Sequence, residues 1–567
     1  MLALQRRNKT LLIISIIFLM YYIQHLISFR LGMNFEESRD ANSYLLAMQG
    51  EVPYKDFEWF YGPFSFFIYP FIMKIFGVNL IVLRLGYIIF ASLVIPLAFF
   101  LARKIMPEFW AGIAAFLSVI FFDVPYYTYN HVFVVLGELG YLLMIIRFTK
   151  TKKNSNLFWA GVFTSVTILT KPLLPGAVLV TASIIFLIIF NDKFVLRKLF
   201  KNCSIYIAGC ISLILFYLTN FHFQIIASKV NLLNFFTSQW PLLFSDQSTT
   251  KLNLNIFHLL HKRLAGVFPI QQILSLSSLS DLKNILVSSL DNFIFILPFI
   301  VPIIILFLYF FSSKFSLNLS KKIYSDKKLL FIFIIFSMLI SSESFLVTHI
   351  YGRAFTIQVS FILLVYLFYL IKHFYRTRRI FISLSITLFL FYVSFLHFFR
   401  YPYSMLKKYT APLNLERAKG ILVTWDEKKL YESLNSYLAL NFKNDDKMVV
   451  VGYYPQFYFL TGKNNAFSDE EYIFLRLDTQ LAFLTQKEET KPLITLENKI
   501  ISRIERESPE ILLTVSDNYS DRLHFIAPGL RNYIEEKYFL DRVFGPADVF
   551  GLGGSPSWLN LYRRRAF

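Results

Sequence analysis

Residues 11–27 read LLIISIIFLMYYIQHLI, an uncharged run that is long enough for a helix that crosses a bilayer. Comparable apolar runs recur at 160–169 and 381–399. Of the 567 residues 56% are hydrophobic and only 17% are charged, whereas an average soluble domain is about 25% charged. Because the apolar residues are clustered along the chain, the sequence predicts a polytopic α-helical membrane protein.

The apolar runs predict about eleven transmembrane helices, whose ends are defined to within a few residues. The expected spans are 11–29, 81–102, 108–122, 131–147, 156–170, 172–190, 203–220, 292–311, 329–344, 354–371 and 379–397.

The net charge of +20 comes from Lys and Arg that gather in every second hydrophilic gap. This distribution is typical of cytoplasmic loops in a multi-pass protein of the cell (plasma or inner) membrane. It places the N-terminus in the cytoplasm and the chain after residue 398 outside. No continuous basic face exists, so nucleic acid is not an expected partner. Cys203 and Cys210 lie in one apolar run and are interpreted as packing residues.

The chain is expected to divide into a transmembrane domain, 1–398, and a soluble extracytoplasmic α/β domain, 399–567. The first external loop of the membrane domain is 30–80, and a long external loop is 221–290. In the second domain charges become frequent and apolar runs become short. Strands are predicted at 446–455 and 508–516, helices at 426–442 and 498–508, and an edge strand at 558–567.

The stretch RDANSYLLAMQGEVPYKDFEWFYGP, residues 39–63, concentrates acidic and aromatic residues in the first external loop. A short helix is predicted from Ser38 to Gly50, with Ser38 or Asp40 as its N-cap. Asp40 and Tyr44 then lie one turn apart on the same face.

A second short helix is predicted to begin at Pro63 and to end at Gly77. Both helices are interpreted as interfacial, lying along the outer membrane surface. The aromatic residues expected in the lipid headgroup region are Trp59, Phe60, Tyr61, Phe66 and Tyr69.

Residues 39–78 resemble the first external loop of the C-type superfamily of integral-membrane glycosyltransferases. Within it the chain is most similar to enzymes that use polyprenyl-phosphate sugars, such as protein O-mannosyltransferases and lipid A aminoarabinose transferases. GVFTSVTILTKP at 161–172, THIYGRAF at 348–355 and VVVGYYPQFYFLTGK at 449–463 resemble further segments of that group. The resemblance implies transfer of a hexose or pentose from a lipid phosphate to a hydroxyl, usually with inversion. The acceptor is a lipid, a glycan or a protein.

Two carboxylates match acidic positions of this group. Asp40 matches the catalytic aspartate of the first loop and would act as the general base on the acceptor hydroxyl. The group often carries a second acidic residue directly after this one, whereas this chain has Ala41. Asp123 matches the second acidic position and would help to place the acceptor. No cofactor is required by the sequence; if a divalent cation is bound, Asp40 and Asp123 would be its ligands.

The leaving group is a phosphate, so cations are expected at the same face. Lys171, His349 and Arg353 are the candidates, and the fork of Arg353 suits a bidentate phosphate contact. The residues expected to bind substrate are Tyr44, Glu58, Tyr61 and Glu138.

Each of these residues also has a purely structural interpretation. Asp40 and Asp123 could cap helices, and Glu58 could be a solvated loop charge. Lys171 could extend to the interface, and His349 and Arg353 could anchor a helix end. Glu138 could be protonated and bonded inside the membrane, with His131 as its partner.

Two other functions compete with the enzyme. A transporter or flippase for a lipid-linked or small polar substrate would show broken helices at the midplane and an internal repeat, and the sequence shows neither. An assembly protein with a C-terminal binding module would need no acidic residue beside a lipid-facing cavity. Gathering of Asp40, Asp123 and Arg353 around one cavity would favour the enzyme.

Overall fold

The fold is taken from a computed structural model. The residues described are 2–59, 61–120, 129–171, 175–189, 196–220, 297, 300–307, 327–346, 353–374, 404–452, 454–470, 474, 494–516, 527–547 and 557–565.

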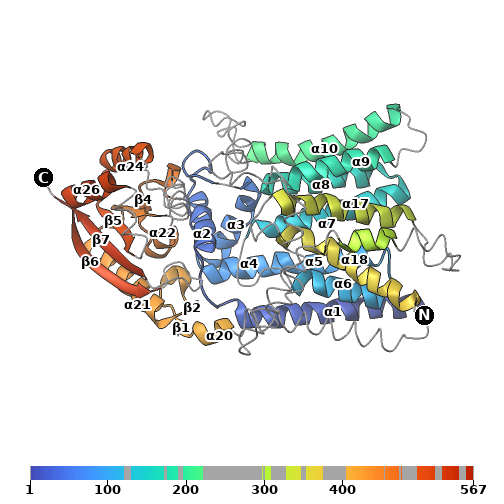
Figure 1. The fold of residues 1–567 in the computed structure, drawn as a ribbon, viewed down its shortest axis with the longest axis horizontal. Coiled ribbons are helices and arrows are strands. Elements are labelled where there is room, and N and C mark those ends of the chain that lie inside the picture. The colour runs from blue at the N-terminus through green and yellow to red at the C-terminus, as the bar shows by residue number, and fades with distance from the viewer. Residues whose placement is uncertain are drawn as a thin grey trace, which may run out of the picture.

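Helices run side by side and form a bundle, and the N-terminus lies at the end of this bundle that is away from the C-terminal strands (Figure 1). They are α1 (Leu2–Ser28), α4 (Leu80–Ser92), α5 (Val94–Ala102), α6 (Glu108–Ile120), α7 (His131–Thr151), α8 (Asn154–Thr170), α9 (Ala177–Ile189), α10 (Leu196–Asn220), α17 (Lys327–Leu346) and α18 (Arg353–Phe374).

The structure places helix in each predicted span up to 354–371, although within 292–311 it describes only residues 297 and 300–307. The span expected at 379–397 lies outside the described residues. Among the described helices, four are long and apolar enough to cross a membrane. They cover Asn8–Ser28, Leu80–Ala102, His131–Thr151 and Leu196–Phe216.

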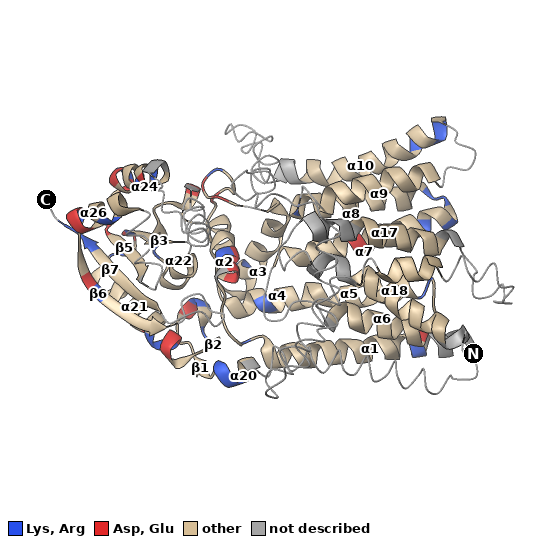
Figure 2. Cartoon of the chain, in the orientation of Figure 1, with Lys and Arg blue, Asp and Glu red and all other residues tan. Residues whose placement is uncertain are grey.

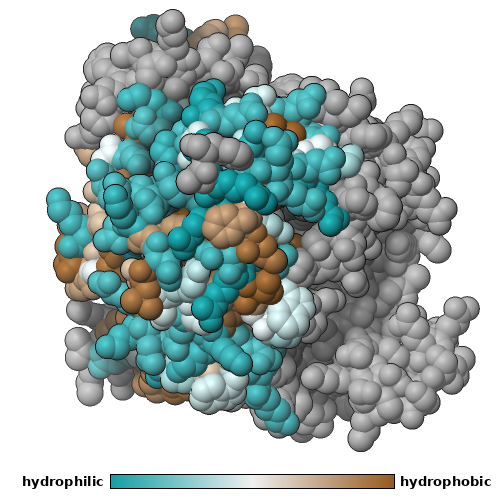
Figure 3. All heavy atoms as spheres, turned by 90° about the vertical axis from the view of Figure 1, so that its left-hand side faces the viewer, coloured by the Kyte–Doolittle hydropathy of each residue, from teal (hydrophilic) through white to brown (hydrophobic). Residues whose placement is uncertain are grey.

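The outer surface of α1 is apolar. Leu12, Leu19 and Leu26 recur every seventh residue on one stripe and are 61%, 61% and 66% exposed. An exposed stripe of this kind is expected on a helix that faces lipid. The end of the molecule that lies farthest from the bundle is mostly hydrophilic by contrast (Figure 3).

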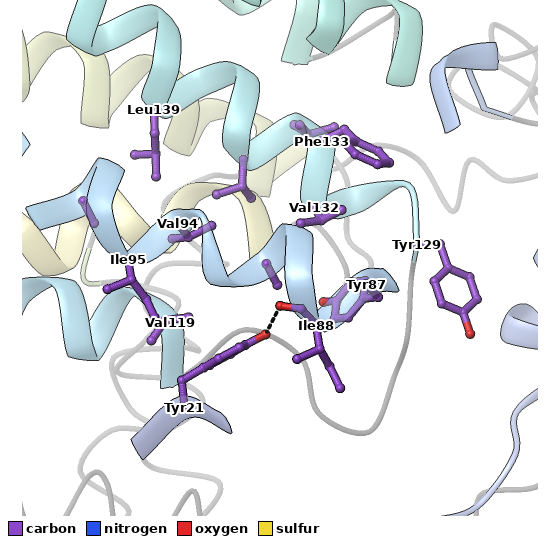
Figure 4. Close-up of a cluster of buried hydrophobic side chains, with 14 of the residues drawn as sticks. Tyr21, Tyr87, Ile88, Val94, Ile95, Val119, Tyr129, Val132, Phe133 and Leu139 are labelled. Atoms are coloured by element: carbon purple, nitrogen blue, oxygen red, sulfur yellow. Dashed lines mark hydrogen bonds between the residues drawn. The ribbon is translucent and has the colours of Figure 1, made fainter. Parts of the chain in front are cut away.

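The interior of the bundle is packed with aliphatic and aromatic side chains from several helices (Figure 4). The hydroxyl of Tyr21 on α1 donates to the carbonyl of Ile88 on α4, at 3.3 Å. Glycines bring other helices still closer together. A Cβ on Gly161 of α8 would lie 2.2 Å from the carbonyl oxygen of Tyr206 on α10. Such close backbone approach is typical of helix pairs in membranes.

The segment 30–80, here called the first loop, carries two helices as predicted. The first, α2 (Phe35–Met48), begins three residues before Ser38. Its cap is Asn34, whose Oδ1 accepts from the Glu37 amide at 2.7 Å. The prediction of Ser38 or Asp40 as cap is therefore wrong, and Asp40 lies within the helix.

The second helical segment agrees with the sequence prediction. A 3₁₀ turn, η1 (Pro63–Phe67), leads into α3 (Tyr69–Phe76), and Gly77 follows with φ +96°. Pro63 suits the first position because its missing N–H has no helical partner there. Gly77 suits the end because its conformation is left-handed.

Three of the aromatic residues that were predicted to lie among lipid headgroups are buried. Trp59 is 4% exposed, Phe66 is 2% exposed and Tyr69 is fully buried. Together they surround the ring of Tyr44 on α2, with centroids 5.0–6.1 Å away. Their prediction as headgroup anchors is wrong, because they fill the space between α2 and the bundle. Phe60 lies outside the described residues.

The C-terminal part, residues 404–565, combines helices with two sheets. Its helical elements are α20 (Ser404–Lys408), η6 (Glu416–Ala418), α21 (Trp425–Asn441), α22 (Gln456–Thr461), η7 (Ser468–Glu470), α24 (Ile494–Glu507) and α26 (Pro528–Lys537). Its strands are β1 (Ala411–Pro412), β2 (Leu422–Val423), β3 (Lys447–Val451), β4 (Asn464–Asn465), β5 (Ile511–Ser516), β6 (Tyr538–Ala547) and β7 (Ser557–Arg564).

The larger sheet has the order β4-β3-β5-β7-β6. The predicted strands at 446–455 and 508–516 correspond to β3 and β5, which pair in parallel. The strand expected at 558–567 is β7, but it is not an edge strand. It pairs antiparallel with β5 on one side and with β6 on the other, so β6 forms the edge.

The first loop and the C-terminal part are joined by backbone hydrogen bonds. The Leu422 amide donates to the carbonyl of Arg30 at 2.7 Å, and the Gly32 amide donates to the carbonyl of Leu422 at 2.8 Å. The Glu58 amide donates to the carbonyl of Ser468 at 2.9 Å. In addition, α22 packs against α2 (Figure 1). The C-terminal part therefore holds the first loop at its start and near its middle.

Candidate active site

Asp40 is a buried carboxylate in the second turn of α2, 1% exposed. Arg39 donates to its Oδ1 from Nε at 2.9 Å and from Nη2 at 2.7 Å. Asn130, just before α7, donates to its Oδ2 from Nδ2 at 3.3 Å. Burial raises the pKa of Asp40 to about 6, although the charge of Arg39 acts in the opposite direction. The carboxylate is thus ionised at neutral pH and close to a useful basicity.

A second buried carboxylate lies one turn earlier on the same helix. Glu37 accepts two hydrogen bonds of 2.6 Å from Arg84 of α4 and one of 2.8 Å from the Tyr129 hydroxyl. Arg84 also donates to the carbonyls of Phe29 and Gly32, at 2.9 and 2.6 Å. Both charges are buried and paired, so this network fixes α2 against the bundle.

Two cations lie against one aromatic ring in the first loop. The guanidinium carbon of Arg39 and the ammonium nitrogen of Lys171 are each 5.1 Å from the centroid of Tyr61. Arg39 also lies 5.8 Å from the centroid of Trp59. This arrangement brings Lys171 to the same ring as Arg39, the cation that bonds Asp40.

Lys171 is held against Tyr61 by close backbone contact between the first loop and the end of α8. The Gly62 amide donates to the carbonyl of Thr170 at 2.7 Å. A Cβ on Gly62 would lie 1.9 Å from the carbonyl oxygen of Leu169, so no other residue fits without movement of the backbone. Nε1 of Trp59 donates to the Gly62 carbonyl at 3.2 Å and steadies the same turn.

The predicted substrate contacts occupy different positions in the structure. Tyr61 lies against both cations, as described above. Tyr44 is fully buried, and its hydroxyl donates to Oδ1 of Asn130 at 3.4 Å. Glu58 is half-buried beside the C-terminal part. Glu138 is buried within α7 at 3% exposure, two turns or about 10 Å further along the helix than His131.

The remaining predicted site residues are described in part or not at all. Arg353 is the first residue of α18. Asp123 and His349 lie outside the described residues. In the part of the chain that the structure describes, no three His, Cys, Asp or Glu side chains gather as metal ligands would.

An open polar pocket of about 500 Å³ lies between the first loop and the C-terminal part. Glu51, Lys55 and Asp56 line it from the loop side, and Lys447 and Glu507 line it from the other side. Its charges of both signs suit a polar ligand better than a lipid chain.

Sequence reasoning did not identify Arg39, Glu37, Arg84 or Asn130 as parts of the site. Arg84 carried a signal, because a charge within an apolar span is costly and usually paired. Arg39 directly precedes Asp40, which is a weaker indication. Nothing in the sequence near Asn130 distinguishes it from a turn residue.

Comparison with known proteins adds the family context. Residues 61–219 match the model of a family described as dolichyl-phosphate-mannose-protein mannosyltransferase. The solved structure of the oligosaccharyltransferase AglB from Archaeoglobus fulgidus, in complex with an inhibitory peptide and a dolichol-phosphate, is similar with a TM-score of 0.53. It is 12% identical, and the match covers 95% of this chain and 74% of that one.

ArnT from Cupriavidus metallidurans, bound to undecaprenyl phosphate, is similar over the whole length. Its TM-score is 0.53 at 10% identity, with 98% of each chain covered. The chain has the fold of the C-type membrane glycosyltransferases. No curated protein matches it in sequence.

The resemblance inferred from residues 39–78 is thus confirmed at the level of the superfamily. The family match contains Tyr61, Asn130 and Lys171, whereas Asp40 precedes it. In this fold Asn130, just before α7, meets the buried aspartate, and the end of α8 meets the first loop at Gly62.

Proposed function

We propose that the chain is an integral-membrane glycosyltransferase that moves a sugar from a polyprenyl-phosphate donor to an acceptor hydroxyl, with inversion. The observation that carries the proposal is Asp40, a buried carboxylate of the first loop that is paired with Arg39, while Lys171 lies against the same Tyr61 ring as that arginine. The similar structures of AglB and ArnT hold dolichol-phosphate and undecaprenyl phosphate, respectively, which supports a donor of this class.

Asp40 acts as the general base. Its carboxylate accepts the proton of the acceptor hydroxyl while the hydroxyl oxygen forms a bond to the anomeric carbon. The bond from the anomeric carbon to the phosphate oxygen breaks, and the electron pair leaves with the lipid phosphate. Because each oxygen of the carboxylate has two lone pairs, the bonds from Arg39 and Asn130 leave room for the acceptor proton.

Lys171 and Arg39 stabilise the charge that develops on the leaving phosphate. Both lie against Tyr61, which faces the same region as Asp40. Cations placed where charge develops lower the barrier more than they do in water, because the site is shielded from solvent. Arg353 and His349 remain predicted phosphate ligands, and Asp123 remains the predicted partner that places the acceptor. A divalent cation, if one is used, would be held by Asp40 and Asp123.

The membrane domain is proposed to be 1–398, and 399–567 is proposed to lie outside the cell membrane. Lys and Arg gather at the ends of the bundle helices away from the C-terminal part (Figure 2). That separation supports a cytoplasmic N-terminus and an extracytoplasmic first loop. The polar pocket between the loop and the C-terminal part is where the acceptor would enter, with Glu58 close by.

The test is a transfer assay in proteoliposomes with a panel of radiolabelled polyprenyl-phosphate sugars. Membrane extracts supply lipid, glycan and protein acceptors. Native protein should transfer one of the sugars, and Asp40→Asn should lose at least about a hundredfold in rate. Glu108→Gln is the control, because Glu108 pairs with Arg103 far from the first loop, at 2.8 Å.

The outcomes separate the hypotheses. Transfer that persists in Asp40→Asn keeps the enzyme but moves the base elsewhere, with Asp123 next. Release of sugar to water without an acceptor would still support the donor chemistry. Movement of intact donor across the bilayer, with no bond broken, would favour the flippase instead.

A further inference from the structure

Two neighbouring residues before α7 contact two carboxylates that lie one turn apart on α2. The Tyr129 hydroxyl donates to Oε1 of Glu37 at 2.8 Å. The Asn130 amide donates to Oδ2 of Asp40 at 3.3 Å. The spacing of three residues puts both carboxylates on the same face of the helix. These two bonds fix the start of α7 relative to α2, the helix that carries Asp40.

The position of Asn130 is fixed by its surroundings. Its side chain is 1% exposed. The preceding residue is anchored twice, because Tyr129 binds Glu37 and its carbonyl accepts from the Tyr69 hydroxyl at 3.3 Å. Glu37 is in turn held by two bonds from Arg84.

The orientation of the Asn130 amide is also determined. Its Oδ1 accepts from the Tyr44 hydroxyl at 3.4 Å. The amide nitrogen, Nδ2, then points to Oδ2 of Asp40. In the flipped orientation the amide oxygen would lie there instead and would be repelled by the carboxylate. The Tyr44 ring cannot turn away, because Tyr69 stacks on it at 5.0 Å and Phe66 meets its edge at 5.3 Å.

We propose that Asn130 is a positioning residue that fixes the rotation of the Asp40 carboxylate, with Tyr44 setting the orientation of Asn130. Arg39 holds Oδ1 and Asn130 holds Oδ2, so the plane of the carboxylate is defined by two bonds from different elements. The remaining lone pair of Oδ2 is then aimed at one place, where the acceptor hydroxyl must lie. The inference rests on the proposed function of Asp40 as base.

A base whose direction is fixed accelerates transfer without tightening donor binding. Removal of Asn130 should therefore lower kcat and leave the donor KM unchanged. A charge-assisted hydrogen bond of this kind corresponds to a loss of about 10- to 100-fold in kcat. Tyr44→Phe should lower kcat by a smaller factor. Without the Tyr44 hydroxyl the Asn130 amide can flip, but in one of its two orientations Nδ2 still donates to Asp40.

The experiment compares Asn130→Ala, Tyr44→Phe and the double variant, with the radiolabelled donor that the native protein uses. Because Tyr44 acts through Asn130, the double variant should be no slower than Asn130→Ala alone. Asn130→Asp keeps the shape of the side chain but replaces the amide with a second buried carboxyl group, which competes with Asp40 for one proton, so it should lose activity even if Asn130→Ala is poorly folded. Asn202→Ala removes another buried amide, from α10, and should leave kcat unchanged.

Unchanged kcat in well-folded Asn130→Ala or Asn130→Asp would overturn the inference. So would losses that multiply in the double variant, because they would show two independent effects. A rise in donor KM alone would assign Asn130 to donor binding and contradict the positioning role. Failure of the base role of Asp40, on which the inference rests, looks different, because the native protein and Asp40→Asn would then show the same rate.

Discussion

Asp40 combines a charged partner with deep burial, and burial has the larger effect on its basicity. Its pKa is raised to about 6 by burial and by the nearby charges of Glu36 and Glu37, against the attraction of Arg39. A base must be ionised to accept a proton, so transfer should fall as the pH drops through about 6 and should level off above it. The pH dependence of kcat/KM measures this directly. Activity that persists undiminished well below that pH would exclude Asp40 as the base.

Arg84 on α4 and Glu37 on α2 form a buried ion pair that fixes α2, the helix that carries Asp40, against the bundle. Removal of one partner leaves the other charge buried and unpaired, which costs about 3–5 kcal/mol in proteins. We expect Arg84→Met to lower the midpoint of thermal unfolding in detergent markedly. The double variant Arg84→Met with Glu37→Gln should recover much of that loss. If it does not, the bonds of Arg84 to the carbonyls of Phe29 and Gly32 are the larger contribution.

At the level of elements, Gly62 of the first loop fits against the end of α8 with no space for a side chain. Gly62→Ala would place a carbon 1.9 Å from the Leu169 carbonyl oxygen, so the turn must move away. Tyr61 would then separate from Lys171. We expect a donor KM raised about tenfold or more, measured in the same transfer assay.

Gly86→Ala on α4 is the matched control for that substitution. A Cβ there would lie 3.0 Å from the flexible end of the Ile72 side chain and 3.5 Å from the Tyr69 ring, which is ordinary van der Waals contact, and it would meet no backbone atom. Its kinetics should stay close to those of the native protein. An equal loss in both variants would mean that Gly62→Ala acts through general destabilisation.

The elements also show which features a sequence can predict. The start of the second helix at Pro63 and its end at Gly77 were predicted, because proline and glycine act through their own backbone. The start of α2 was misplaced, since Asn34, Ser38 and Asp40 are all good caps. Trp59, Phe66 and Tyr69 were assigned to the lipid surface because an aromatic residue suits a headgroup layer and a packed core equally well.

In the whole molecule, the features that escaped prediction join distant parts of the chain. Asn130 is 90 residues from Asp40, and Arg84 is 47 residues from Glu37. No local pattern encodes such pairs. The same holds for β7, whose sequence is that of a strand but whose interior place depends on β5 and β6.

The joint between the first loop and the C-terminal part leads to a prediction about the whole chain. The amides of Gly32, Glu58 and Leu422 are bonded across it and should exchange slowly with deuterated water. Leu422→Pro removes the donor to Arg30, so peptides covering residues 30–34 should exchange faster than in the native protein. Exchange that is fast already in the native protein would show that the joint is open in the membrane.

That joint also has a consequence for the timing of biosynthesis. The first loop leaves the ribosome early, yet the groups that hold it, such as the Gly420 carbonyl on Arg30, follow 390 residues later. At the usual pace of translation this interval is about 20 to 80 s. During that time the first loop lacks its hydrogen bonds to the C-terminal part. The protein therefore acquires the supported form of its first loop only when its synthesis is nearly complete, and a chain interrupted before Gly420 would lack that support.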